Sequence, residues 1–196
     1  MAIEHWLYYL RGRVLETFRR KEGAIAAYRD ALGVSPAFAR AANQAAYVLA
    51  SLERYAEAES FFQRVLESEP RNAIAHFNLG FTLEKLGRIE EAIESFREAT
   101  RIKPGIDRAW YGMGLCLAQL GRHAEAATAL EQAAELQPMN PHAWYALGMA
   151  YYAAHNPKRL KQTIFHLVRF DPKMARRLIL ESESTHLAYL VKDLEV

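Results

Sequence analysis

Five of the seven prolines in this 196-residue chain stand 34 residues apart, at Pro36, Pro70, Pro104, Pro138 and Pro172. A period of this length is typical of chains built from repeated supersecondary units. Each such unit buries its apolar surface only against its neighbours in the array. The sequence therefore predicts a linear stack of similar units rather than one globular core.

Other positions follow the same period. Counting back from each proline, the 24th residue is glycine or alanine, the twelfth is alanine in four units, and the eighth is large and apolar. These columns are Gly12, Ala46, Gly80, Gly114 and Gly148; Ala24, Ala58, Ala92, Ala126 and Leu160; and Tyr28, Phe62, Phe96, Leu130 and Ile164. Glycine is unfavourable inside a helix by about 1 kcal/mol relative to alanine. We therefore expect the glycine column to face the alanine column, where two helices pack closely.

Each unit is predicted to contain two helices. In the third unit, apolar residues at helical spacing are interrupted at Gly87 and resume at Ile89. The proline then ends the second helix. In the fifth unit, Asn140-Pro141 and Asn156-Pro157 each predict an N-cap followed by proline at the first helical position. No segment alternates with period two, so the predicted fold class is all α.

The columns resemble the tetratricopeptide repeat, whose 34-residue pattern combines W-x2-L-G-x2-Y, A-x3-F and P. Residues 110–117 and 144–151 match its first half, and Ala58-x3-Phe62 and Ala92-x3-Phe96 match its second. The resemblance covers residues 5–172 and implies a right-handed superhelical solenoid of antiparallel helix pairs. The repeats are expected at residues 5–38, 39–72, 73–106, 107–140 and 141–174. The larger residues at Leu160, Ile164 and Leu167 indicate a changed packing partner in the fifth repeat.

Residues 173–196 follow the last periodic proline and are expected to form a C-terminal capping helix and tail. Met174, Leu178 and Ile179 form an apolar stripe that can cover the last repeat. A polar stretch at 181–185 then precedes a second short helix. That tail is expected to pack on its own chain or on a partner.

The resemblance also implies that the first helices line a concave groove that binds a partner. The groove positions carry cations and amides in the N-terminal and middle repeats, and apolar or aromatic residues in the C-terminal ones. The candidate groove residues are Arg13, Arg40, Asn43, Tyr47, Asn78, Phe81, Lys85, Arg108, Tyr111, Leu115, Tyr145 and Met149. The alternative is that some aromatic residues, Phe77 and Tyr145 above all, pack within the array instead.

These residues predict a non-enzymatic scaffold or adaptor that binds a protein or peptide, with acidic groups or a C-terminal carboxylate at the cationic end of the groove. The carboxylate clamp by which some members of the family bind chaperone tails is incomplete. Its five positions hold Asn43, Tyr47, Asn78, Arg108 and Gly112, and only Asn78 matches outright.

Two alternatives to groove binding remain. Stacking of the array end to end, or exchange of the tail, would build a homo-oligomer. Residues 158–177 hold seven Lys or Arg residues and one acid, which would suit an acidic protein, an anionic membrane or RNA. The simpler interpretation is that this basic segment forms a solvent-exposed outer face without a partner. The net charge of +2 over the whole chain favours neither nucleic acid nor a membrane as the main partner.

No catalytic residue, metal site or cofactor is predicted. Cys116, the single cysteine, lies in a column of small residues and is expected to be buried and inert. His76 occupies the column of Trp110 and Trp144, which favours packing over metal binding. The sequence shows no secretory signal and no apolar run long enough to span a membrane, so we expect a cytoplasmic protein. A chain trimmed of its signal would look the same, so a periplasmic location stays open.

Overall fold

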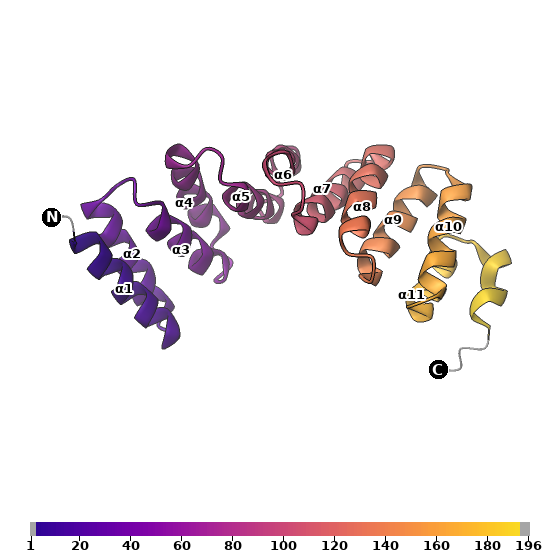
Figure 1. Ribbon diagram of the computed structural model, residues 1–196, viewed down its shortest axis with the longest axis horizontal. Coiled ribbons are helices and arrows are strands. Elements are labelled where there is room, and N and C mark those ends of the chain that lie inside the picture. Colours follow the sequence, from indigo (N-terminus) through magenta and orange to yellow (C-terminus); the bar gives the residue numbers. More distant parts are fainter. Residues whose placement is uncertain (1–2, 193–196) are drawn as a thin grey trace. The chain divides into compact units, whose positions relative to one another are not determined.

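The structure, a computed structural model, describes residues 3–192. Within this range every regular element is a helix and none is a strand, which confirms the predicted all-α fold class. Consecutive helices run side by side as antiparallel pairs (Figure 1). The chain divides into two compact units, Met1–Lys103 and Pro104–Val196.

Unit 1 contains three helix pairs: α1 Glu4–Thr17 with α2 Lys21–Val34, α3 Ala39–Ala50 with α4 Tyr55–Ser68, and α5 Ala73–Lys85 with α6 Ile89–Ile102. The second helix of one pair also packs against the first helix of the next, α2 on α3 and α4 on α5. Many of the buried residues on these helices are alanines, whose short side chain lets helix backbones approach closely while retaining the best helix propensity.

Unit 2 contains α7 Asp107–Gln119, α8 His123–Leu136, α9 Pro141–Ala153, α10 Pro157–Val168, α11 Pro172–Glu181 and a 3₁₀ helix, η1, at Thr185–Val191. The two predicted Asn-Pro caps are confirmed. Asn140 Oδ1 accepts from the backbone N–H of His142 at 3.1 Å, and Asn156 Oδ1 accepts from that of Arg159 at 3.2 Å. Asp171 caps α11 in the same way through Met174.

The glycine column faces the large apolar column. A Cβ added at Gly80 would lie 2.8 Å from Cδ1 of Phe96, and one at Gly114 would lie 2.5 Å from Cγ of Leu130. At Gly12 the obstructing group is the ring of Tyr28. The nearest neighbours of these glycines are thus one helical turn beyond the expected alanine column, which approaches only at Gly114, where Ala126 O lies 3.3 Å from an added Cβ. Glycine is present because it leaves room for the ring or branched side chain that fills the centre of each pair.

The fifth pair departs from this pattern. A Cβ at Gly148 would collide with Leu178, which comes from α11 and not from α10. Leu178 and Ile179 are buried, and η1 covers α11 with the buried Leu187 and Val191. At Gly148 a side chain of α11 thus takes the place that a second-helix side chain has in earlier pairs, while α10 still packs on α9. The expected tail helix is a 3₁₀ helix over its described part, and residues 193–196 lie outside the described residues.

One turn position recurs with the period and takes a positive φ each time. It holds Arg19, Glu53, Gly87, Gly121 and His155, with φ between 52° and 76°. Left-handed backbone is unfavourable for residues other than glycine because Cβ approaches the following carbonyl. Only two of the five turns therefore have the residue that best fits this geometry.

Gly87→Ala is expected to lower the free energy of unfolding by about 1–2 kcal/mol, because its backbone must hold φ of +76°. No heavy atom lies within 4 Å of an added Cβ there, so the loss comes from the backbone alone. Gly33→Ala is the matched control. It has equally open surroundings, lies in helix α2, and should be neutral or stabilising. Urea denaturation of both variants tests this, and a shift of the same sign in the two would contradict it.

Arginines at the start of the second helices join consecutive repeats in unit 1. Arg54 Nη1 lies 2.9 Å from Glu22 Oε1 of α2, and its Nε lies 2.6 Å from Glu57 Oε1 of α4. Arg88, 34 residues later, bridges Glu59 and Glu91 at 2.7 and 2.5 Å. The Arg54 guanidinium holds the pKa of Glu57 below its usual range. A single exposed ion pair contributes little to the free energy of folding. Together, these ion pairs hold neighbouring second helices in register.

Candidate functional site

Two consecutive first helices in unit 1 carry predicted site residues on a shared face. Helix α3 presents Arg40, Asn43 and Tyr47, and helix α5 presents Asn78, Phe81 and Lys85. Within each helix these residues are three or four positions apart, so they lie on one side. Helix α4 packs against both α3 and α5. We refer to these six residues as the α3–α5 face.

The α3–α5 face keeps two large aromatic side chains in solvent. Tyr47 is 61% exposed and Phe81 is 39% exposed, and they occupy equivalent positions 34 residues apart. The ring of Phe81 meets Tyr55 edge-on at a centroid distance of 6.4 Å. Lys85 Nζ lies 5.2 Å from the centre of the Phe81 ring. A cation is thus held beside an exposed aromatic surface.

Polar groups on this face are available to a ligand. The side-chain amides of Asn43 and Asn78 are half-buried and make no hydrogen bond to any residue of the range 3–192. Arg40 is exposed, and its guanidinium lies 5.5 Å from the centre of the Trp6 ring with no carboxylate partner among the described residues. Lys85 has one exposed partner, Glu84, at 3.2 Å. Arg13, on α1, is exposed and lies 4.0 Å from Glu16.

In unit 2 the predicted aromatic surface is partly occupied by the chain itself. The hydroxyl of Tyr145 donates to Glu181, and the Arg177 guanidinium lies 4.7 Å from the centre of the Tyr145 ring. Arg177 and Glu181 form an ion pair at 2.7 Å. Burial and the contact with Glu181 raise the pKa of Tyr145, while the hydrogen bonds from Tyr145 and Arg177 lower that of Glu181. Tyr145 is therefore engaged by α11, which favours the packing alternative for this residue.

The other unit 2 candidates range from half-buried to exposed, as do the residues of the α3–α5 face. Arg108 and Tyr111 border a hollow of about 180 Å³ together with residues of α8 and α9. Burial raises the pKa of Tyr111. Met149 is half-buried, and Leu115 is exposed. Phe77, the second residue for which packing was the alternative, lies 6.1 Å from the ring of Phe96 in its own helix pair.

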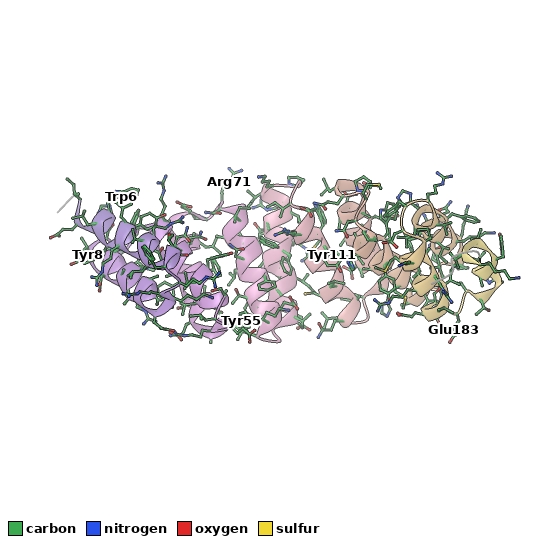
Figure 2. All side chains as sticks on the ribbon, turned by 90° about the horizontal axis from the view of Figure 1, so that it is seen from below. Trp6, Tyr8, Tyr55, Arg71, Tyr111 and Glu183 are labelled. Atoms are coloured by element: carbon green, nitrogen blue, oxygen red, sulfur yellow. The ribbon has the colours of Figure 1, made fainter. Side chains whose placement is uncertain are left out.

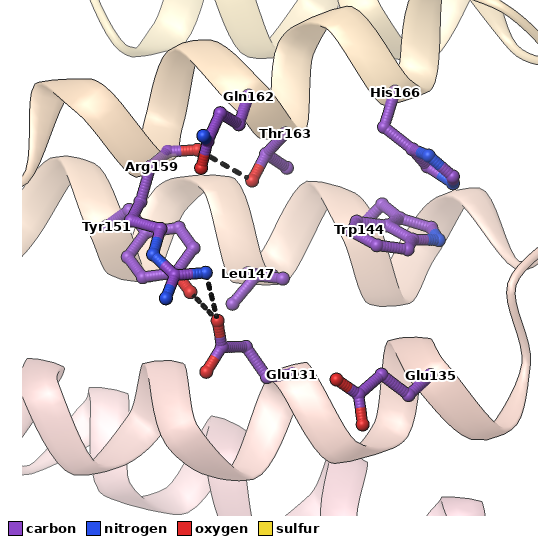
Figure 3. A pocket seen from close by; sticks show the side chains of 9 residues that line it. All are labelled: Glu131, Glu135, Trp144, Leu147, Tyr151, Arg159, Gln162, Thr163 and His166. Carbon is purple, nitrogen blue, oxygen red and sulfur yellow. Dashed lines mark hydrogen bonds and ion pairs between the residues drawn. The ribbon is translucent and has the colours of Figure 1, made fainter.

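A second hollow in unit 2 lies between α8, α9 and α10 (Figure 3). Its volume is about 270 Å³, just below the roughly 300 Å³ at which small-molecule sites begin. Glu131 in its wall already accepts a hydrogen bond from Tyr151 and pairs with Arg159 at 3.2 Å. His166 stacks on Trp144 at a centroid distance of 3.9 Å. These contacts tie the three helices together, and the hollow is best explained as a polar packing layer.

The tryptophan column has a role that the sequence did not reveal. Nε1 of Trp110 and of Trp144 donates to the carbonyl of Pro104 and of Pro138, each at 2.8 Å and six residues upstream. His76 Nε2 lies 3.0 Å from the carbonyl of Pro70 in the same arrangement. In three of the five repeats the column thus fixes the loop into the first helix, at α5, α7 and α9, and His76 contacts its own loop. The sequence does show a ring six residues after the periodic proline in these three repeats, and that spacing could have predicted the contact.

Other predicted features are placed as follows. Cys116 is buried, as expected. In the basic segment 158–177, Arg159 and Arg177 are paired with Glu131 and Glu181, so its effective charge is smaller than the sequence indicates. Residues 3–192 contain no group of three His, Cys, Asp or Glu side chains placed to hold a metal ion. No helix in that range is both long and apolar enough to span a membrane.

Comparisons with known proteins agree with this architecture. A family model for the tetratricopeptide repeat matches residues 9–68, and one described as the cilia and flagella-associated protein 70 middle TPR-like domain matches residues 51–169. A comparison with curated protein sequences found no match.

Several solved structures are similar. The chain resembles the MamA protein with a TM-score of 0.80 at 19% identity, covering 94% of this chain and 96% of that one. It resembles YrrB, a TPR protein with an unusual peptide-binding site, with a TM-score of 0.78 at 25% identity and 90% coverage of both chains. It resembles pilF of Pseudomonas aeruginosa with a TM-score of 0.70 at 22% identity, covering 95% and 88%. With the family models spanning more than half of its length, the chain belongs to the tetratricopeptide repeat family.

Proposed function

We propose that this protein is a non-enzymatic scaffold that binds a segment of a partner protein on the α3–α5 face. The observation that carries the proposal is the pair of exposed aromatic rings, Tyr47 and Phe81, at equivalent positions on consecutive first helices. Large exposed aromatic side chains are typical anchors of protein interfaces because they bury much area with little loss of rotamer freedom. YrrB, a similar structure, has a peptide-binding site, which supports a peptide as the ligand.

The surrounding groups indicate which peptide would bind. Arg40 and Lys85 favour a segment with carboxylates, since guanidinium and ammonium groups form charge-assisted hydrogen bonds with them. The amides of Asn43 and Asn78 can bond to the backbone of an extended segment, because each offers both a donor and an acceptor. The proposed ligand is thus a short peptide with an apolar residue for the aromatic rings and acidic residues beside it.

The expected result of Tyr47→Ala with Phe81→Ala is a loss of at least about tenfold in affinity for such a peptide, because two anchors are truncated. Ligands are first selected from a displayed peptide library against the full chain. Their dissociation constants are then measured for the wild type and the variants by fluorescence anisotropy.

A matched control is available in unit 2. Tyr189→Ala with Phe165→Ala removes one tyrosine and one phenylalanine that are 62% and 38% exposed, almost the same as the test pair. This control should bind like the wild type. Equal affinity of the test variant and the wild type, with an unchanged circular dichroism spectrum, would disprove the proposal.

A further inference from the structure

Helix α1 is apolar on both of its sides. One side packs on α2, where the rings of Tyr9 and Tyr28 are 5.8 Å apart and Gly12 is buried. The other side carries five large apolar residues that are all more than half exposed. They are Ile3, Leu7, Leu10, Val14 and Phe18, with exposed fractions between 54% and 72%. We call these five residues the α1 stripe; Trp6 and Tyr8, labelled in Figure 2, belong to the same helix.

Two residues of the α1 stripe, Leu7 and Val14, lie where later repeats receive a neighbouring helix. Positions 34 and 68 residues after Leu7 are Ala41 and Ala75, and both are fully buried. The corresponding positions after Val14 are Val48 and Thr82, which are also buried. These residues lie on α3 and α5, which pack against α2 and α4. Among residues 3–192 no helix covers the equivalent side of α1. This side of α1 therefore matches the sides of α3 and α5 that receive a helix, but no helix packs on it.

The C-terminal end of the described residues offers a different surface. There, η1 packs on α11 and buries Leu187 and Val191 against it. Head-to-tail stacking needs two complementary open ends. Of the two terminal elements, α1 and η1, only α1 presents a continuous apolar stripe. A symmetric dimer, in which the α1 stripe of one copy packs on the α1 stripe of the other, needs only this one face.

The spacing and charges of α1 fit such a pairing. The first four residues of the stripe are separated by four, three and four positions, which is the seam of a coiled coil. Beside the seam, Glu4 and Arg11 are exposed, and neither forms an ion pair within residues 3–192. In an antiparallel pair with Leu7 opposite Leu10 of the second copy, Glu4 of each helix lies beside Arg11 of the other. In a parallel pair these positions lie on opposite sides of the seam, so Glu4 of one copy cannot reach Arg11 of the other.

We propose that two copies of this chain form a dimer through the α1 stripe, with the two α1 helices antiparallel. Burial of eight large apolar side chains, Ile3, Leu7, Leu10 and Val14 from each copy, supplies the main driving force. The two symmetric Glu4–Arg11 pairs set the direction. This surface shares no residue with the α3–α5 face, so dimerisation and peptide binding can fail independently.

Sedimentation equilibrium of the full chain over a concentration series tests this proposal. The wild type is expected to be a dimer, and Leu7→Glu with Leu10→Glu a monomer with an unchanged circular dichroism spectrum. Met139→Glu is the control, because Met139 is even more exposed, at 71%, but lies in unit 2, and this variant should remain dimeric.

Charge exchange tests the antiparallel direction. Glu4→Arg and Arg11→Glu should each weaken the dimer by about tenfold, because each creates two like-charge contacts. An equimolar mixture of these two variants should recover the wild-type association, since each contact in the mixed dimer again joins opposite charges. A wild type that is monomeric at every concentration, or a dimer that survives the two leucine substitutions, would overturn the proposal.

Discussion

Phe96→Ala is expected to lower the free energy of unfolding by about 3–5 kcal/mol, the largest effect of any single substitution considered for this chain. Phe96 is 1% exposed and fills the centre of the α5–α6 pair between Gly80 and Phe77. Truncation removes the ring and leaves a cavity that the two helices cannot close without moving. Because Gly80 has no side chain, nothing on that side can refill the space.

Urea denaturation followed by far-ultraviolet circular dichroism measures this loss. Phe165→Ala is the control, since Phe165 is 38% exposed on α10 and its truncation should cost about 1 kcal/mol or less. A loss below about 1 kcal/mol for Phe96→Ala would show that the ring does not form the centre of its helix pair.

Gly80→Leu is expected to destabilise the same site from the opposite direction, by about 1–3 kcal/mol. The new Cβ alone would lie 2.8 Å from the Phe96 ring, and the rest of the leucine would have no space beyond it. Gly80→Ala should cost clearly less, because the second repeat holds Ala46 in this column and still buries Phe62. The two substitutions therefore give a graded series at one position.

Gly33→Leu is the matched control for this series, because no heavy atom lies within 4 Å of an added Cβ at Gly33. It should leave the stability nearly unchanged. Equal melting temperatures for wild type and Gly80→Leu would contradict close packing between α5 and α6.

The periodic part of the fold could be predicted because each repeat presents the same evidence several times. Proline, glycine and aromatic columns together determine helix pairs and their turns. They do not determine the rotation of each helix about its axis, so they do not distinguish glycines that face the alanine column from glycines that face Phe96 and its equivalents. The left-handed turns at Arg19, Glu53 and His155 also lack the glycine that would have marked them.

The candidate site could be predicted only where the repeat pattern extends. Tyr47 and Phe81 lie in one column, and the structure leaves both accessible. Tyr145 lies in the groove by its repeat position, but its ring is covered by Arg177 and Glu181 from α11. That segment occurs once in the chain, so no other repeat indicates where it packs. The uncovered side of α1 is likewise not indicated by the repeat pattern, because the equivalent residues Ala41 and Val48 are buried.

The most direct test of the proposed function is a two-dimensional amide NMR titration of the full chain with a selected acidic peptide. If the peptide binds on the α3–α5 face, the largest shift changes will occur at Asn43, Tyr47, Asn78, Phe81 and Lys85. The outward side of the second helices α2 and α4 should stay unchanged, and Tyr47→Ala with Phe81→Ala should abolish the response. Changes concentrated on those second helices, with none at Tyr47 or Phe81, would contradict a binding site on the α3–α5 face.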